Sequence, residues 1–206
     1  ARKEMWEKFE IIYRPVDRRD NYVKRCVGIP GDTIQLVDGA LYVNGTLVPE
    51  LKTQQTTYAV QTNGTTINPK AFERLGISKA DQQYYVGASY VLPLTRENSE
   101  KIAKFSNVKE VQPIINRKGL FQPYIFPGKQ SLGWNEDNLG PVWIPRKGVT
   151  VSIDTSNIAF YERIIDVYED NDFRIENSTI YINDQPATSY TFKMDYYWMM
   201  GDNRHN

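Results

Sequence analysis

The 206-residue sequence predicts a mostly β protein with an α+β insertion. Residues 9–48 contain short apolar runs separated by the pairs Asp38-Gly39 and Asn44-Gly45, which are strong hairpin signals. The long middle of the chain instead mixes helical and strand patterns. We therefore expect a discontinuous β core with one inserted α+β domain. The expected core comprises residues 1–50 and 190–206, and the insertion comprises residues 51–189.

The first part of the chain is expected to start inside an amphipathic helix and to continue as a strand meander. Its tightest turn is Ile29-Pro30-Gly31-Asp32, because proline presets one turn position and glycine supplies the unusual dihedral angle. The predicted strands are Phe9–Tyr13, Tyr22–Ile29, Thr33–Val37 and Ala40–Val43.

The insertion opens with a short helix, in which Asn68 is the N-cap, Pro69 is the first helical residue and Gly76 ends the helix. A second helix is expected to follow its N-cap Thr95. Helical spacing of apolar residues predicts a third. The remaining expected elements are a strand over Tyr84–Leu94, the helix from Thr95 to Phe105, an extended Val108–Ile115, loop with short strands over 117–148, the helix over Asn157–Glu169, and strands over Ile180–Asn183 and Tyr190–Met200.

Composition excludes several classes of protein. Lysine plus arginine equals aspartate plus glutamate at 25 each, so the basic excess of a nucleic-acid binder is missing. No apolar run approaches the roughly 20 residues of a membrane helix, so the chain as written reads as soluble. Single cysteine and histidine residues cannot form a disulfide, a cysteine metal cluster or a multi-histidine site. We expect no metal and no cofactor.

Lys24 is the candidate for chemistry. Alternation along the predicted strand places it on one face with Tyr22 and Cys26, among apolar neighbours. Burial would lower the pKa of its amine, and a neutral amine is a competent general base. A strand lysine can also bury its stem and keep its tip in water. The residues of this strand alone leave both interpretations open.

Two motifs resemble the bacterial type I signal peptidases. One is Lys24-Arg25-x-x-Gly28-x-Pro30-Gly31-Asp32, followed by a hairpin that ends in Val43-Asn44-Gly45; the other is Met199-Met200-Gly201-Asp202-Asn203-Arg204. The resemblance covers residues 9–48 and 190–206. It implies a signal-peptidase-like β core from the extracytoplasmic catalytic domain. The insertion resembles the cap domain that Gram-negative members carry there.

The resemblance implies a serine endopeptidase with a Ser/Lys dyad, which removes signal peptides from exported preproteins. Lys24 matches the general base and Arg25 the basic residue beside it. The loop that packs against the active site is matched by Gly201, Asp202, Asn203 and Arg204, and Asp202 is expected to pair with a nearby arginine. The implied partners are signal peptides and the bacterial inner membrane. An N-terminal anchor would hold the domain on the periplasmic side.

The sequence departs from the family pattern at both ends. The family nucleophile lies in an upstream Ser-Met-x-Pro box near a membrane anchor, and neither is present in these residues. The second box normally continues with a serine that hydrogen-bonds the lysine, whereas the sequence stops at Asn206. We therefore expect a piece of a longer protein that is catalytically inert by itself.

Two alternatives use a similar β scaffold. A non-catalytic module would bind extended peptides by strand addition. A self-cleaving repressor is disfavoured, because the long insertion and the Gly-Asp-Asn-Arg box are foreign to it. Among other reactive side chains, Cys26 is expected to be small core filler and His205 a surface residue, and the remaining serines are assigned to caps and turns. Trp198 and its aromatic and methionine neighbours are expected to form a core strand. The alternative, implied by the resemblance, is that an apolar surface near the active site meets the membrane and leaves part of this set exposed.

Overall fold

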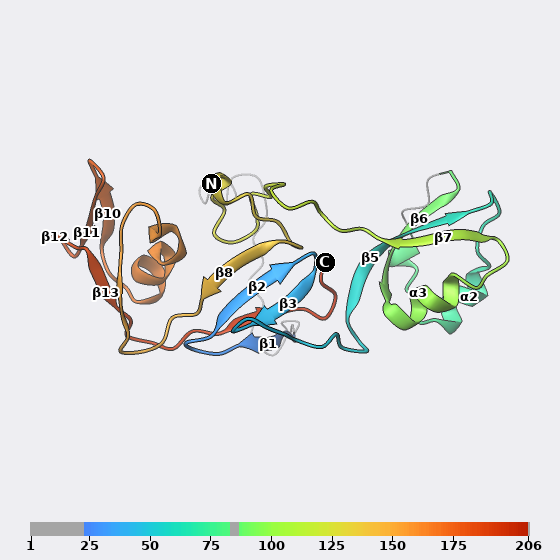
Figure 1. The fold of residues 1–206 in the computed structure, drawn as a ribbon, viewed down its shortest axis with the longest axis horizontal. Coiled ribbons are helices and arrows are strands. Elements are labelled where there is room, and N and C mark those ends of the chain that lie inside the picture. The colour runs from blue at the N-terminus through green and yellow to red at the C-terminus, as the bar shows by residue number, and fades with distance from the viewer. Residues whose placement is uncertain (1–22, 83–86, 206) are drawn as a thin grey trace, which may run out of the picture.

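Three hydrophobic cores lie side by side along the length of the molecule (Figure 1). The computed structural model describes residues 23–82 and 87–205. The expected N-terminal helix, the strand Phe9–Tyr13 and the beginnings of the strands predicted from Tyr22 and Tyr84 lie outside these residues. Strands predominate over helices, and the mostly β prediction is confirmed.

The central core is built on a four-stranded sheet of order β4-β3-β2-β8, with β1 and β14 forming a separate antiparallel pair. The Asp38-Gly39 turn joins β2 to β3, and both residues have the positive φ angles, 49° and 78°, of a tight hairpin. The predicted bounds of β2 and β3 are confirmed. The strands are β1 (Arg25–Gly28), β2 (Thr33–Val37), β3 (Ala40–Val43), β4 (Thr46–Leu47), β8 (Leu139–Trp143) and β14 (Trp198–Met200).

The second core belongs to a sheet of order β6-β5-β7 covered by two short helices (Figure 1). As predicted, the Asn68 side chain caps the first helix by accepting a hydrogen bond from Lys70 N, and Thr95 caps the second by accepting one from Asn98 N. The elements are β5 (Gln55–Thr62), α2 (Pro69–Arg74), η2 (Ala80–Gln82), β6 (Ser89–Thr95), α3 (Arg96–Ile102) and β7 (Val108–Pro113).

The third core packs irregular helical turns against two small sheets at the opposite end of the molecule (Figure 1). The segment predicted as a helix over Asn157–Glu169 is helical over most of its length, but it consists of a 3₁₀ turn and a π-helical turn and not of one regular helix. Asn157 bonds Asp154 N and Ser152 O through its side chain, which favours a turn over a continuing α-helix. The elements are β9 (Thr150–Ser152), the 3₁₀ turn η4 (Ile158–Phe160), the π-helical η5 (Ile164–Tyr168), β10 (Phe173–Glu176), β11 (Thr179–Ile182), β12 (Gln185–Pro186) and β13 (Ser189–Thr191).

The segment 51–189, expected as one insertion, has two cores with a piece of the central sheet between them. Strand β8 lies in the middle of this segment and pairs with β2, Ile34 opposite Val142 and Leu36 opposite Leu139. It is the edge strand of its sheet, which tolerates Pro141. Its short, proline-containing sequence gives no local signal of a partner a hundred residues away.

The strand predicted over Tyr190–Met200 is also divided. Its first residues form β13 in the third core, and its last residues form β14 beside β1 in the central core. Within the described part of the chain, no helix combines the length and hydrophobicity needed to cross a membrane.

Candidate functional site

The two sequence motifs meet because β1 and β14 pair antiparallel. Arg25 lies opposite Met200 and Cys26 opposite Met199. Lys24 directly precedes β1, and Gly201 directly follows β14, so the two residues face each other at the end of the pair. A Cβ atom on Gly201 would stand 3.0 Å from Lys24 Nζ. The absence of a side chain at Gly201 therefore allows the lysine amine to lie against the backbone.

Arg25 and Asp202 form the next contact between the motifs. Arg25 donates from Nε to Oδ1 at 3.0 Å and from Nη2 to Oδ2 at 2.9 Å, a two-pronged ion pair. Thr53 adds a hydroxyl donor to Oδ2 at 2.8 Å. The hydrogen bonds from Arg25 and Thr53 lower the pKa of Asp202 to about 2. The predicted pairing of Asp202 with an arginine is confirmed.

The end of the second motif is fastened to β5. Gln55 N donates to Asp202 O at 2.8 Å, and Arg204 N donates to Gln55 O at 2.9 Å. These two hydrogen bonds form a parallel β-bridge between Gln55 and Asn203. The Arg204 guanidinium contacts Gln54 Oε1 and Met200 Sδ, and burial lowers its pKa. Asn203 and Arg204 therefore support the loop from within.

Lys24 and Cys26 are both exposed. The expectation that Cys26 is core filler is wrong, and of the two interpretations left open for Lys24 the structure agrees with a lysine whose tip lies in water. In the described residues β1 pairs with β14 alone, and the strand starts at Arg25, so Lys24 lies just outside the sheet. Only the end of β1 enters the core: a Cβ on Gly28 would stand 2.4 Å from Ile144 Cδ1. Lys24 therefore lies at the surface, at the end of the β1–β14 pair.

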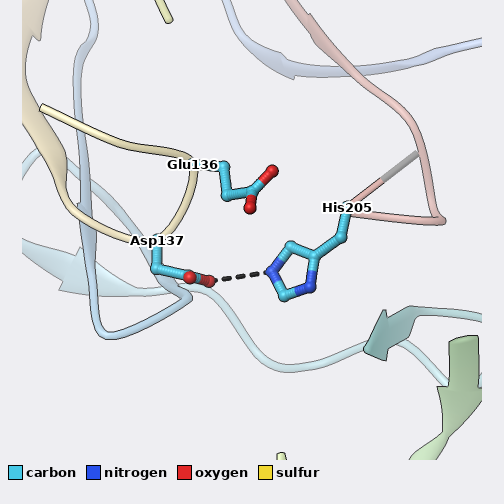
Figure 2. Close-up of side chains that lie close together, drawn as sticks. All are labelled: Glu136, Asp137 and His205. Carbon is cyan, nitrogen blue, oxygen red and sulfur yellow. Dashed lines mark hydrogen bonds and ion pairs between the residues drawn. The ribbon is translucent and has the colours of Figure 1, made fainter. Parts of the chain in front are cut away.

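His205 was expected at the surface, and this prediction is wrong. Its side chain is only 7% exposed and contacts Asp137, which is 1% exposed, with Nε2 2.9 Å from Oδ1 (Figure 2). Its Nδ1 accepts a hydrogen bond from Thr57 N at 3.1 Å. The hydrogen bond to Asp137 raises the pKa of His205.

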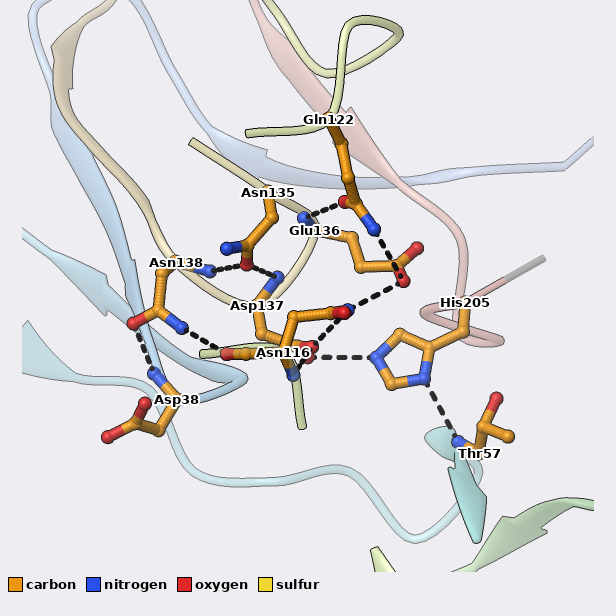
Figure 3. A network of polar contacts seen from close by, with 9 residues as sticks. All are labelled: Asp38, Thr57, Asn116, Gln122, Asn135, Glu136, Asp137, Asn138 and His205. Carbon is orange, nitrogen blue, oxygen red and sulfur yellow. Dashed lines mark hydrogen bonds and ion pairs between the residues drawn. The ribbon is translucent and has the colours of Figure 1, made fainter. Parts of the chain in front are cut away.

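Sequence reasoning also missed Asp137. Burial alone would raise the pKa of its carboxyl, but the hydrogen bonds from His205 and Asn116 outweigh burial and lower it. Asp137 belongs to a buried polar network in the loop before β8 (Figure 3). The one available signal was the run Asn135–Asn138, four consecutive polar residues between tryptophan and an apolar strand.

A cavity of about 590 Å³ lies beside this site. Apolar side chains from β3, β4 and β5, including Leu41, Leu47 and Tyr58, share its wall with charged ones. Arg25 and Arg204 of the two motifs line it as well. The site thus adjoins a partly apolar depression large enough for several side chains.

Comparison with known proteins gives a family match. A family described as "Signal peptidase, peptidase S26" matches residues 3–121, more than half of the chain. The chain is 44% identical over 43 residues to Signal peptidase I of Bacillus caldolyticus, covering 21% of this chain and 24% of that protein. It is 50% identical over 34 residues to Signal peptidase I of Bacillus licheniformis, and this stretch covers 16% of this chain and 18% of that protein.

A third similar protein is Signal peptidase IB of Staphylococcus aureus (strain Mu50 / ATCC 700699), 41% identical over 39 residues that cover 19% of this chain and 20% of that protein. The aligned stretches thus span between 18% and 24% of the length of these curated relatives. No solved structure matches the chain.

Proposed function

This chain belongs to the peptidase S26 family of signal peptidases, and on that premise we propose that it is part of a serine endopeptidase that removes signal peptides from exported preproteins. One observation carries the proposal. The pairing of β1 with β14 holds Lys24 against Gly201 and Arg25 against Asp202, although the two motifs are 177 residues apart in the chain. The two boxes that carry the family resemblance thus form one site.

In the proposed reaction, Lys24 is the general base. In its unprotonated form, the amine takes the proton of a serine hydroxyl as that oxygen attacks the scissile carbonyl. The resulting ammonium returns the proton to the leaving amine when the peptide bond breaks. The serine is expected elsewhere in the full-length protein. We propose that the Gly201–Arg204 loop is kept next to Lys24 by contacts of its own residues and of Arg25. The supporting residues are Arg25, Gly201, Asp202, Asn203 and Arg204.

We also propose that the protein acts at the periplasmic surface of the bacterial inner membrane. Two side chains at or near β14 support this location, because Tyr197 is 58% exposed and Met199 is 50% exposed. Exposed apolar groups next to a site that takes membrane-bound substrates would lie against the lipid surface.

The test is signal-peptide cleavage by the full-length protein with Lys24 or with Lys24→Ala. We expect the variant to lose at least about a hundredfold in kcat, the usual contribution of a positioned general base. Lys109→Ala changes an exposed lysine of β7 and serves as the matched control. Full cleavage by Lys24→Ala would overturn the assignment. The same assay on the 206 residues alone tests the expectation that they are inert.

The second candidate is a module that binds extended peptides without cleaving them. The cavity beside Arg25 and Arg204 favours it, because it offers apolar and charged walls to a peptide. A synthetic signal peptide that binds the full-length protein but stays intact over long incubation would support this alternative over the peptidase.

A further inference from the structure

His205, the only histidine in the sequence, joins three distant parts of the chain. It follows Arg204 directly, Thr57 belongs to β5, and Asp137 lies in the loop before β8. Figure 3 shows the ring between Thr57 N and the Asp137 carboxylate. Protection of the ring from solvent makes both hydrogen bonds costly to lose.

The partners of the ring fix its tautomer. A backbone N–H can only donate, so the Nδ1 atom that receives the Thr57 N–H must carry a lone pair. In the neutral ring the proton therefore sits on Nε2 and is donated to Asp137 Oδ1. His205 is thus held as an acceptor toward β5 and a donor toward Asp137.

Asp137 is itself held rigidly, so it can orient the ring. Its Oδ2 accepts hydrogen bonds from Asn116 N at 2.7 Å and Asn116 Nδ2 at 2.9 Å. Asn138 continues the network by accepting a hydrogen bond from Asp38 N in the β2–β3 hairpin (Figure 3). The chain of contacts therefore runs from the central sheet to the end of the second motif.

The same side chains invite a metal-binding interpretation, since ligand atoms of Glu136, Asp137 and His205 lie within 4.8 Å of one another (Figure 2). A histidine that binds a metal through Nε2 must donate from its Nδ1–H instead. Here Nδ1 faces the Thr57 N–H, and Nε2 is the protonated atom. The ring orientation therefore opposes a metal ion at this place.

We propose that His205 is a positioning residue whose neutral ring ties the Gly201–Arg204 loop to β5 and to Asp137, and so keeps Gly201 against Lys24. The inference rests on the proposed function. In the described residues the charged groups that face the ring are Asp137 and Glu136, both from the loop before β8, whereas β5 contributes only the Thr57 N–H. When Nδ1 is protonated, its N–H points at the Thr57 N–H, and two donors cannot form a hydrogen bond. The hydrogen bond to β5 is therefore lost, whereas the contact with Asp137 remains as an ion pair.

The first test is NMR spectroscopy of the 206-residue chain, in which a single histidine gives unambiguous ring signals. We expect an unprotonated Nδ1 and a protonated Nε2 at neutral pH. On acidification through the histidine transition, protection of the Thr57 amide against hydrogen exchange should fall roughly three- to tenfold relative to Val60 in the same strand, the factor that one ordinary hydrogen bond supplies. An Nδ1–H tautomer, or unchanged relative protection, would overturn the proposal.

Variants separate positioning from mere packing. His205→Asn keeps an acceptor near the Nδ1 position but cannot titrate, so relative Thr57 protection should become independent of pH. Glu136→Gln removes the second charge facing the ring and should lower the histidine pKa while leaving the tautomer unchanged. A shift of the ring signals on addition of equimolar Zn²⁺ would support the metal site instead. None of these measurements needs cleavage, so they can fail independently of the proposed function.

In the full-length protein, the acid limb of the kcat/KM pH profile should lose the His205 contribution in His205→Asn. A purely structural role would lower kcat/KM equally at every pH, and this result would contradict the proposal.

Discussion

The Nζ atom of Lys24 lies 3.0 Å from the point where a Cβ atom on Gly201 would stand. The contact joins the residue before β1 to the residue after β14, and the ion pair between Arg25 and Asp202 lies directly beside it. Lys24 and Arg25 on one segment thus lie next to Gly201 and Asp202 on the other. The lysine amine lies against the glycine backbone, and the arginine and aspartate form an ion pair beside it.

Gly201→Ala is expected to lower activity more than stability. The added methyl group meets the flexible end of Lys24, which can move aside, and the Asn203 carbonyl oxygen at 3.2 Å. We expect at least a tenfold loss of signal-peptide cleavage by the full-length protein and a loss in unfolding free energy of under about 1 kcal/mol. If the methyl group acts through Lys24, its stability cost should shrink in a Lys24→Ala background. An equal cost in both backgrounds would contradict the contact.

Gly28→Ala, in contrast, is expected to lower stability more than activity. Its Cβ would stand 2.4 Å from Ile144 Cδ1 and 3.0 Å from Ile34 Cγ2, both in the central core. Overpacking of this kind costs about 1–3 kcal/mol, which urea unfolding would measure. Gly201→Ala is the matched control, because it adds the same methyl group outside the core. Equal stability of the two variants would show that β1 does not pack as described.

Asp202→Asn should destabilise the fold at neutral pH and have less effect in acid. The pKa of Asp202 is about 2 in the folded protein, below the value of about 4 for an unfolded chain. Its contribution to stability is therefore present above pH 4 and is lost as the pH falls toward 2. Urea unfolding between pH 2 and 7 should show the curves of wild type and variant converging in acid.

The control for this prediction is Glu97→Gln, which removes an ion pair with Lys101 between two exposed positions of α3. We expect no measurable change, because this pair joins no distant segments. A difference between Asp202→Asn and wild type that stays constant down to pH 2 would rule out the ion pair as its cause.

Glu169→Gln should destabilise the third core. This buried carboxylate accepts hydrogen bonds from the Tyr190 and Tyr196 hydroxyls and from Lys193 N and Met194 N. The NH₂ group of a glutamine would face some of these hydroxyl and N–H donors and could not accept their hydrogen bonds. We expect a loss of about 2–3 kcal/mol in unfolding free energy. Glu176→Gln, at an exposed position of β10, should change stability by under about 0.5 kcal/mol. Similar values for the two variants would contradict the role of Glu169.

Local signals predicted local structure well. The bounds of β2 and β3 follow from alternation and from Asp38-Gly39, and the caps Asn68 and Thr95 were predicted from residue type. These features depend on neighbours a few residues apart, whose preferences the sequence states directly. The segment predicted as one helix over Asn157–Glu169 is instead a 3₁₀ turn followed by a π-helical turn, each with backbone hydrogen bonds of its own.

By itself, the sequence determined the two motifs, since these depend on residue type and order. The pairing of β1 with β14 then decided that Arg25 is the arginine that contacts Asp202. Only the tertiary structure decided that β8 returns to the central sheet, that Lys24 is exposed, and that His205 is buried against Asp137. Burial is the combined result of contacts between segments far apart in the chain. No local pattern around residue 205 encodes a carboxylate at residue 137, and only the folded chain brings the two together.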